Sequence, residues 1–361
     1  MARRVLITGV ARHLGGRLAQ ILSASPEVEV VVGVDTTAPK VDLGRTEFVR
    51  ADIRNPIIAK VINTERIDTV VHMNLISTPE RAGGRTAMKE INVIGSMQLL
   101  AACQKAPSVR RLIVKSSTAI YGSSSRDPAL FTEDSPPRGA PSGFAKDAVE
   151  VEGYVRGFGR RRPDVALTVL RFSNFIGPRL ESSLTRYLSL PVVPTVLGYD
   201  PRIQLCHEDD ALEVLRLAAL TDRSGIVNVA GEGQLLLSQA IRRAGRLWVA
   251  VPPPAVTITG ELLRRAKVVD VSPEQIRFLE HGRVADVAKL RDSFGYKAQY
   301  TSSAAFDDWA SSSGLRVVDP AAVQLAERIA YQTLRRGKEQ VQRFTGPLRA
   351  VLSGVRESVN V

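Results

Sequence analysis

Val5-Leu6-Ile7-Thr8-Gly9-Val10-Ala11-Arg12-His13-Leu14-Gly15-Gly16 is the stretch that decides the fold. Its apolar, β-branched opening predicts a buried strand, and Gly9 predicts the turn that ends it. A helical spacing of apolar residues begins at Leu14 and continues through Leu18 and Leu22. Such a strand, turn and helix bring backbone N–H groups and the positive end of a helix dipole up to a diphosphate.

A second predicted strand, residues 28–34, leads into Asp35, twenty residues after Gly15. A carboxylate at this distance from the glycine turn can accept hydrogen bonds from an adenosine ribose. The same charge repels a 2′-phosphate, so we expect NAD as the cofactor, with NADP less favoured. The alternative, a strand-turn-helix without a ligand, leaves the acid at this position unexplained.

Composition narrows the class of protein. The chain has 361 residues, 44% of them hydrophobic, which is typical of a globular protein. Cys103 and Cys206 are far apart and predicted to be reduced core thiols, and no His/Cys cluster indicates a metal. We expect a cytoplasmic protein without a signal peptide or membrane span. The net charge of +12 comes from scattered residues rather than a basic stripe, so we predict no nucleic-acid partner.

Further apolar runs alternate with helical patterns along the chain. We predict strands at residues 47–53, 67–75, 111–115, 166–170 and 226–231. This alternation predicts an α/β fold, a Rossmann-type doubly wound parallel sheet. Asp52 and Ile53 end the third strand, where an acid can bind an adenine amine or cap the next helix. We predict that His72 is a core histidine and that Asn92 bonds the backbone of a neighbouring segment.

Taken together, the motifs resemble those of the extended short-chain dehydrogenases/reductases, in the NAD-dependent epimerase/dehydratase family that includes UDP-glucose 4-epimerases. The matching pieces are Thr8 to Gly15, Asp35, Asp52-Ile53, His72, Asn92, Ser116-Ser117 before Tyr121-Gly122, Lys146, and residues 171–178, 207–210 and 286–295. The resemblance implies that the cofactor contacts Gly9, Arg12, Leu14, Gly15, Asp35, Asp52, Ile53, Asn74, Asn92 and Lys146. Arg12 stands where the family pattern TGxxGxxG has glycine, and is expected either to reach a phosphate or to point to solvent.

The resemblance also implies catalytic roles. A serine four residues before the Tyr-Gly pair, here Ser117, holds the reacting oxygen. The family's general base is a tyrosine four residues before a helix lysine that binds the nicotinamide ribose. With Lys146 as that lysine, the tyrosine position is Ser142, whose hydroxyl is too weak an acid and too short to replace an activated phenol.

Two functions follow from this comparison. The first is an epimerase/dehydratase-like enzyme that acts on a nucleotide sugar by transient hydride transfer to NAD, with Asn174 matching a family substrate-binding asparagine. The alternative is a catalytically inactive NAD(H)-binding regulatory or scaffold protein, favoured by the missing tyrosine. The resemblance further implies a homodimer formed by helices around residues 90–104 and 144–158.

The predicted organisation has three parts. Residues 1–180 together with 204–231 form the dinucleotide-binding domain, and residues 181–203 and 232–318 form a smaller, C-terminal substrate lobe. Residues 319–361 form a basic helical tail with apolar residues at helical spacing. Such a helix usually packs on protein, and the alternative is contact with an anionic membrane surface.

Overall fold

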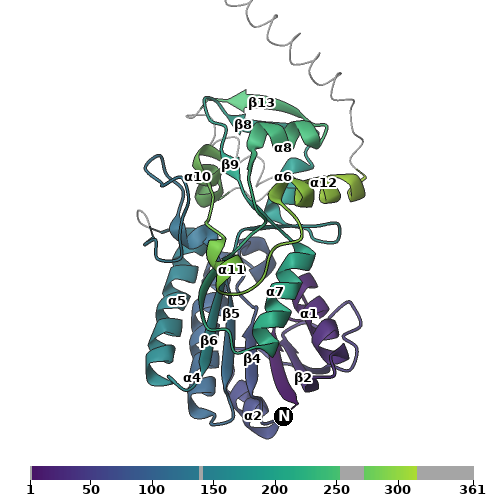
Figure 1. The fold of residues 1–361 in the computed structure, drawn as a ribbon, viewed down its shortest axis with the longest axis vertical. Coiled ribbons are helices and arrows are strands. Elements are labelled where there is room, and N and C mark those ends of the chain that lie inside the picture. The colour runs from purple at the N-terminus through teal and green to yellow at the C-terminus, as the bar shows by residue number, and fades with distance from the viewer. Residues whose placement is uncertain (1, 138–140, 253–271, 315–361) are drawn as a thin grey trace, which may run out of the picture.

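The structure, a computed structural model, describes residues 2–137, 141–252 and 272–314. Its largest element is a seven-stranded sheet in which every neighbouring pair is parallel (Figure 1). In spatial order the strands are β11 (Gly225–Val229), β6 (Ala166–Phe172), β5 (Arg111–Ser117), β4 (Thr69–His72), β1 (Arg3–Thr8), β2 (Val28–Asp35) and β3 (Glu47–Arg50). The predicted doubly wound parallel sheet is therefore confirmed.

Helices cover both faces of the sheet because its central strands are apolar on both sides. Val5 and Ile7 of β1 pack into one core with α1 and α7, whereas Leu6 packs into a second core with α2, α4 and α5. Figure 1 shows α1 and α7 on one side of the sheet and α4 and α5 on the other. The helices are α1 (His13–Ala24), α7 (Glu208–Leu220), α2 (Ile57–Thr64), α4 (Ser96–Lys105) and α5 (Gly143–Arg161).

The strand order reverses at β1, whose neighbours are β2 and β4. Chain connections leave the sheet in opposite directions at such a point, and ligands of open α/β sheets bind in the crevice outside the carboxyl ends of the strands there. The loop after β1 therefore stands at the edge where this architecture places a ligand.

A second, smaller part sits above the carboxyl edge of the sheet and has its own apolar core, which includes Ile203, Phe278 and Phe306. Its described residues form short pieces of sheet and four helices. Its strands are β7 (Asn174–Ile176), β8 (Val192–Val196), β9 (Arg202–Ile203), β10 (Leu205–His207), β12 (Leu235–Leu236), β13 (Leu247–Val251) and β14 (Gly282–Arg283). Its helices are α6 (Ser183–Leu188), α8 (Leu237–Arg243), α10 (Pro273–His281) and α12 (Ser302–Ser312), and the short α11 (Ala288–Asp292) lies against β11.

Some strands end at residues other than those predicted from the sequence. The third strand ends at Arg50 rather than residue 53, and β6 continues to Phe172. Between β4 and α4 lie a short turn η1 (Pro79–Ala82), α3 (Arg85–Lys89) and a π-helical turn η2 (Glu90–Gly95), and η3 (Thr118–Tyr121) follows β5. Within the described ranges, no helix has the length and apolarity needed to cross a bilayer. The predicted tail, residues 319–361, lies outside the described residues.

Candidate dinucleotide and substrate site

The loop after β1 has the geometry of a diphosphate cradle. Gly9 has φ +82°, a conformation that side chains disfavour, and its N–H donates to Val34 O at 2.9 Å. Helix α1 begins four residues later at His13. A Cβ atom on Gly15 would come within 2.1 Å of Gly9 O, so only glycine lets the helix approach the loop this closely. The result is a helix N-terminus presented to the crevice above β1.

Asp35 fixes the far side of this loop. Its carboxylate accepts hydrogen bonds from the backbone N–H groups of Ala11 at 3.1 Å and Thr36 at 2.7 Å. The negative charge therefore stands at the end of β2, beside the glycine loop, as the sequence predicts. A carboxylate has further lone pairs with which to accept ribose hydroxyls.

Asp52 and Ile53 lie further from the crevice. Asp52 pairs with Arg54 at 2.7 Å, and the hydrogen bond from Arg54 lowers the pKa of that carboxyl. Ile53 is buried, with its side chain against Gly95. Asp35, Asp52 and Ile53 are absent from the lining of the main pocket, which therefore represents the other end of the candidate dinucleotide site.

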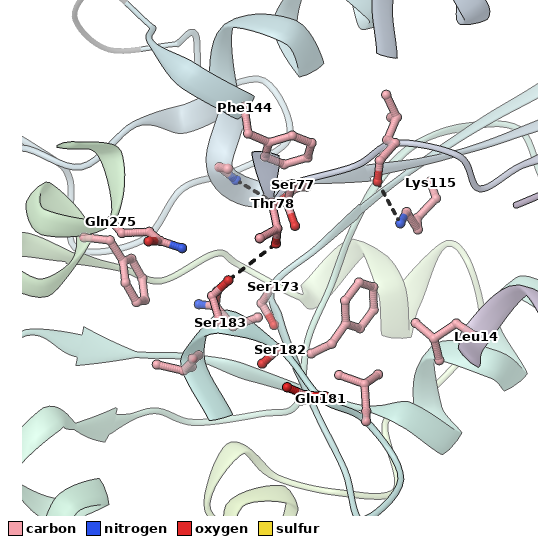
Figure 2. A pocket seen from close by; sticks show the side chains of 18 of the residues that line it. Leu14, Ser77, Thr78, Lys115, Phe144, Ser173, Glu181, Ser182, Ser183 and Gln275 are labelled. Atoms are coloured by element: carbon pink, nitrogen blue, oxygen red, sulfur yellow. Dashed lines mark hydrogen bonds between the residues drawn. The ribbon is translucent and has the colours of Figure 1, made fainter. Parts of the chain in front are cut away.

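That pocket joins the sheet edge to the smaller part of the molecule (Figure 2). The glycine loop contributes Gly9, Arg12, Leu14 and Gly15 to its wall, and the end of β5 contributes Ser117. From the smaller part come residues of β7, α6 and α10, among them Asn174, Ser182, Glu274 and Gln275. Four residues predicted to bind the cofactor and two predicted to bind the substrate thus share one cavity.

Strand alternation decides which hydroxyl at the end of β5 faces this cavity. Ser116 points to the helix side, where its hydroxyl donates to Glu152 at 2.6 Å. Ser117 faces the pocket and accepts a hydrogen bond from Ala119 N at 3.1 Å. Its own O–H can therefore donate to a ligand oxygen.

Helix α5 does not present the predicted catalytic pair. Lys146 is exposed and is not part of the pocket wall, and Ser142 stands before the first turn of the helix, where Arg277 donates to its hydroxyl. Two residues correspond to about 200° around a helix, so Phe144 rather than Lys146 enters the pocket. One turn further on stands Ala148, which is fully buried. The structure therefore places Lys146 and Ser142 outside the pocket wall, and their catalytic roles stay predictions.

The polar residues in and near β4 form hydrogen bonds inside the protein. His72 is buried between the Thr8 and Ser96 hydroxyls, at 2.9 and 2.8 Å, which confirms a core histidine. Asn92 accepts from Ile76 N at 2.8 Å and donates to Ile76 O at 2.9 Å, so the predicted backbone bonds are confirmed. With both ends of its amide engaged and no exposure, Asn92 shapes the loop wall rather than reaching a ligand. Asn74 packs its backbone against Gly9.

Several ionisable side chains on the pocket wall are absent from the sequence prediction, among them Lys115, Glu274 and Arg283. Burial raises the pKa of Glu274, whose carboxylate also accepts from Ala145 N at 3.3 Å. Burial lowers the pKa of Arg283 to about 10, and its guanidinium donates to Gly122 O at 2.7 Å. Only Lys115 leaves a signal in the sequence, as a single charge within an otherwise apolar strand.

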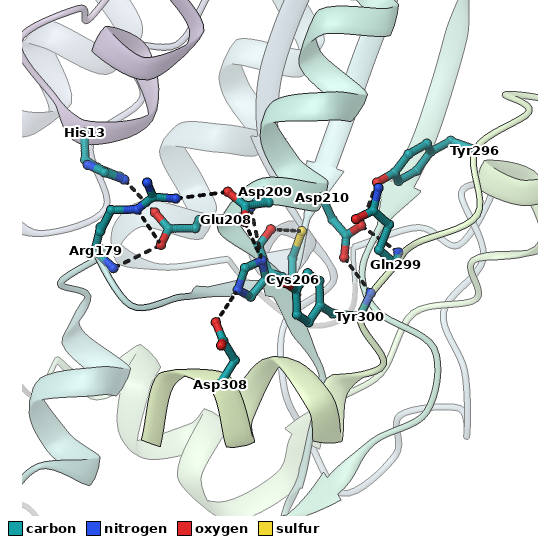
Figure 3. A network of polar contacts seen from close by, with 11 residues as sticks. His13, Arg179, Cys206, Glu208, Asp209, Asp210, Tyr296, Gln299, Tyr300 and Asp308 are labelled. Carbon is teal, nitrogen blue, oxygen red and sulfur yellow. Dashed lines mark hydrogen bonds and ion pairs between the residues drawn. The ribbon is translucent and has the colours of Figure 1, made fainter. Parts of the chain in front are cut away.

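A polar network ties the start of α1 to α7 (Figure 3). His13 Nε2 lies 2.5 Å from Glu208 Oε2, and Arg179 N donates to the other oxygen of that carboxylate at 3.0 Å. Burial opposes ionisation of Glu208, but the bonds from His13 and Arg179 outweigh it and lower its pKa. The network holds the first turn of α1 in place beside the glycine loop.

The parallel sheet, the glycine cradle, the acid after β2 and the serine after β5 are the features of a dinucleotide-binding α/β fold. The chain belongs to the NAD dependent epimerase/dehydratase family, whose sequence profile matches residues 5–230. This confirms the predicted family and, with it, NAD as the cofactor.

The chain is also similar to individual proteins. An uncharacterized protein of Mycobacterium tuberculosis is 50% identical over 322 residues, covering 88% of this chain and 86% of that protein. A UDP-glucose 4-epimerase of Haemophilus influenzae is 25% identical over 185 residues, covering 48% of this chain and 53% of that enzyme. The crystal structure of a UDP-glucose 4-epimerase from Stenotrophomonas maltophila, with bound NAD and formylated UDP-arabinopyranose, matches with a TM-score of 0.69 at 19% identity. It covers 90% of this chain and 99% of that one.

Proposed function

We propose that the protein binds NAD along the carboxyl edge of its sheet and acts on a nucleotide-sugar-like substrate by transient hydride transfer. The observation that carries this proposal is the single pocket that joins the glycine loop to Ser117 and Asn174. A cofactor on the loop and a substrate against Asn174 would meet beside Ser117. The Haemophilus relative, a UDP-glucose 4-epimerase by name, supports a sugar nucleotide as the substrate class.

The described residues fit the cofactor. Gly9 and Gly15 leave room for the diphosphate, since a Cβ at Gly15 would clash with the loop itself. Arg12 and Leu14 line the same wall. In this proposal Asp35 binds the adenosine ribose, and Asp52 and Ile53 contact the adenine. NAD supplies a hydride acceptor when bound, and Ser117 would donate a hydrogen bond to the substrate oxygen. We assign substrate binding to residues 181–203 and 232–318.

Calorimetry with NAD and NADP tests the cofactor half of this proposal. We expect NAD to bind, and Asp35→Asn to weaken NAD about 10- to 100-fold, because a charged hydrogen-bond acceptor contributes about 1.5–3 kcal/mol. The same variant should narrow the preference for NAD over NADP. Asp42→Asn, an exposed acid in the loop after β2, is the matched control. Absence of heat with both dinucleotides in the wild-type protein would contradict the proposal.

A second candidate function is NAD(H) binding without catalysis, in a regulatory or scaffold role. The observation that favours it is the contribution of α5 to the pocket wall, where Phe144 offers no group that can move a proton; Ala148, buried one turn later, offers none either. Absorbance at the nicotinamide band, followed with UDP- and dTDP-sugars, separates the two functions. Signal in the wild-type protein supports the enzyme. Signal only in the double variant Phe144→Tyr, Ala148→Lys supports a binding protein that has lost its proton carriers.

A further inference from the structure

The reacting part of the pocket needs a group that can take a proton, and α5 does not provide one. The side chain of Phe144 fills the helix side of the pocket, Ala148 is buried one turn later, and Lys146 points to solvent. Ser117 can donate a hydrogen bond but is a very weak base. A proton acceptor for a carbinol must therefore come from another element of the wall.

Lys115 stands in that place. It is two residues before Ser117 on β5, and alternation along a strand puts both side chains on the same face. Figure 2 shows Lys115 on the pocket wall, with its Nζ donating to Leu75 O at 3.2 Å. The ammonium also lies 6.0 Å from the centre of the Phe175 ring. One backbone acceptor leaves two of its three donor positions directed elsewhere.

The charges around Lys115 favour a neutral amine. No carboxylate of the described residues forms an ion pair with its Nζ. Burial first, and then the positive charge of Arg12 from the glycine loop, lower the pKa of Lys115 to about 7. His72 of β4 is near enough to interact electrostatically with Lys115, but burial lowers the pKa of that imidazole to about 3, so it adds no charge at neutral pH. The other ionisable side chains on the pocket wall are His13, Glu181, Tyr187, Glu274 and Arg283.

We propose that Lys115 is the proton acceptor of this site, with Ser117 hydrogen-bonded to the same substrate oxygen. The inference rests on the proposed function. In the oxidation step the carbinol carbon gives up its hydride to NAD, and the O–H bond breaks. The proton moves to the lone pair of Lys115 Nζ while the C–O bond becomes C=O. The return step moves the proton and the hydride back, so the amine and the cofactor end as they began.

Competitive labelling with a trace of acetic anhydride from pH 5 to pH 11 tests this without any substrate. Mass spectrometry of the peptides gives a titration curve for each lysine of the intact protein, and exposed Lys105 and Lys146 serve as internal references. We expect Lys115 to titrate near pH 7 and NAD to protect Lys115 but not Lys105. If NAD fails to bind in calorimetry, the proposed function fails. If NAD binds while Lys115 titrates with Lys105 and gains no protection, only the present inference fails.

Variants give the second test. Lys115→Met keeps the length of the side chain and removes the base, and we expect NAD affinity within about threefold of wild type but turnover reduced about 10²–10⁴-fold. The turnover that remains in Lys115→Met should no longer depend on pH near 7. Lys115→Arg, whose side chain stays protonated, should not restore the wild-type turnover. Lys105→Met is the control. Unchanged turnover in Lys115→Met, or a comparable loss in Lys146→Met instead, would overturn the inference.

Discussion

Gly15 lies where the first turn of α1 passes the preceding loop, and its replacement is the sharpest test of the cradle. In Gly15→Ala the new Cβ would meet Gly9 O at 2.1 Å, with Gly9 C at 2.8 Å, so the helix must move. We expect a loss of about 1–3 kcal/mol in the free energy of unfolding and no measurable NAD binding. Gly157→Ala, within α5, is the control and should stabilise by about 0.5–1 kcal/mol. Normal NAD binding by Gly15→Ala would show that the diphosphate lies elsewhere.

His72 is also a single-residue test, because its surroundings fix the sign of a pH effect. Its pKa falls from 6.5 to about 3 in the folded protein because burial penalises the charged ring. The unfolded chain therefore binds a proton that the folded chain does not, and this residue's contribution to stability is lost as pH falls from 6.5 towards 3. His72→Gln should lose less stability over that range, by up to about 1.4 kcal/mol per pH unit. Denaturant unfolding at several pH values measures this, and equal slopes would contradict it.

At the scale of elements, one buried network joins β5, α5 and β6. Glu152 of α5 accepts from Arg171 Nη2 at 2.7 Å and from Ser116 Oγ at 2.6 Å, and Arg171 Nη1 donates to Tyr121 OH at 2.9 Å. Glu152→Ala leaves a buried guanidinium without its carboxylate and should cost about 3–5 kcal/mol. The double variant Glu152→Met, Arg171→Met should recover much of that loss. Thermal unfolding measures both, with Glu150→Ala as the control, and a single variant as stable as the control would be contrary evidence.

The elements also show what sequence could predict. Apolar runs broken by glycine define the parallel strands, and the position of Asp35 follows from the β1–α1–β2 spacing. Sequence alone does not determine which side of α5 lines the pocket. An error of two residues in the helical phase puts Lys146 at the pocket in place of Phe144. Glu274 lies 129 residues after Ala145, the α5 residue whose N–H donates to it, and no local sequence pattern indicates that contact. The sequence shows Lys115 as a charged residue within a predicted buried strand, but only the folded structure shows that its side chain points into the pocket.

Two exposed apolar side chains lie on the helix layer that contains α4, on the face of the sheet opposite α1. Ile94 and Met97 stand next to each other on η2 and α4, with exposed fractions of 45% and 43%. Helices α4 and α5 pack together on that face of the sheet, so a second copy of the chain could bury both residues against its own equivalent pair. The homodimer implied by the family resemblance would use this surface.

Light scattering after size exclusion tests the dimer. The chain has a mass of 39.2 kDa, and we expect the wild-type protein to elute with twice that mass. Ile94→Glu combined with Met97→Glu places two like charges in a symmetric contact, where each meets its own copy in a medium of low dielectric constant, and should give the monomer. Val249→Glu, which changes an equally exposed apolar residue on β13, should leave the mass unchanged. If the double variant keeps the dimer mass while Val249→Glu loses it, the two-fold contact lies on the smaller part instead, at β13.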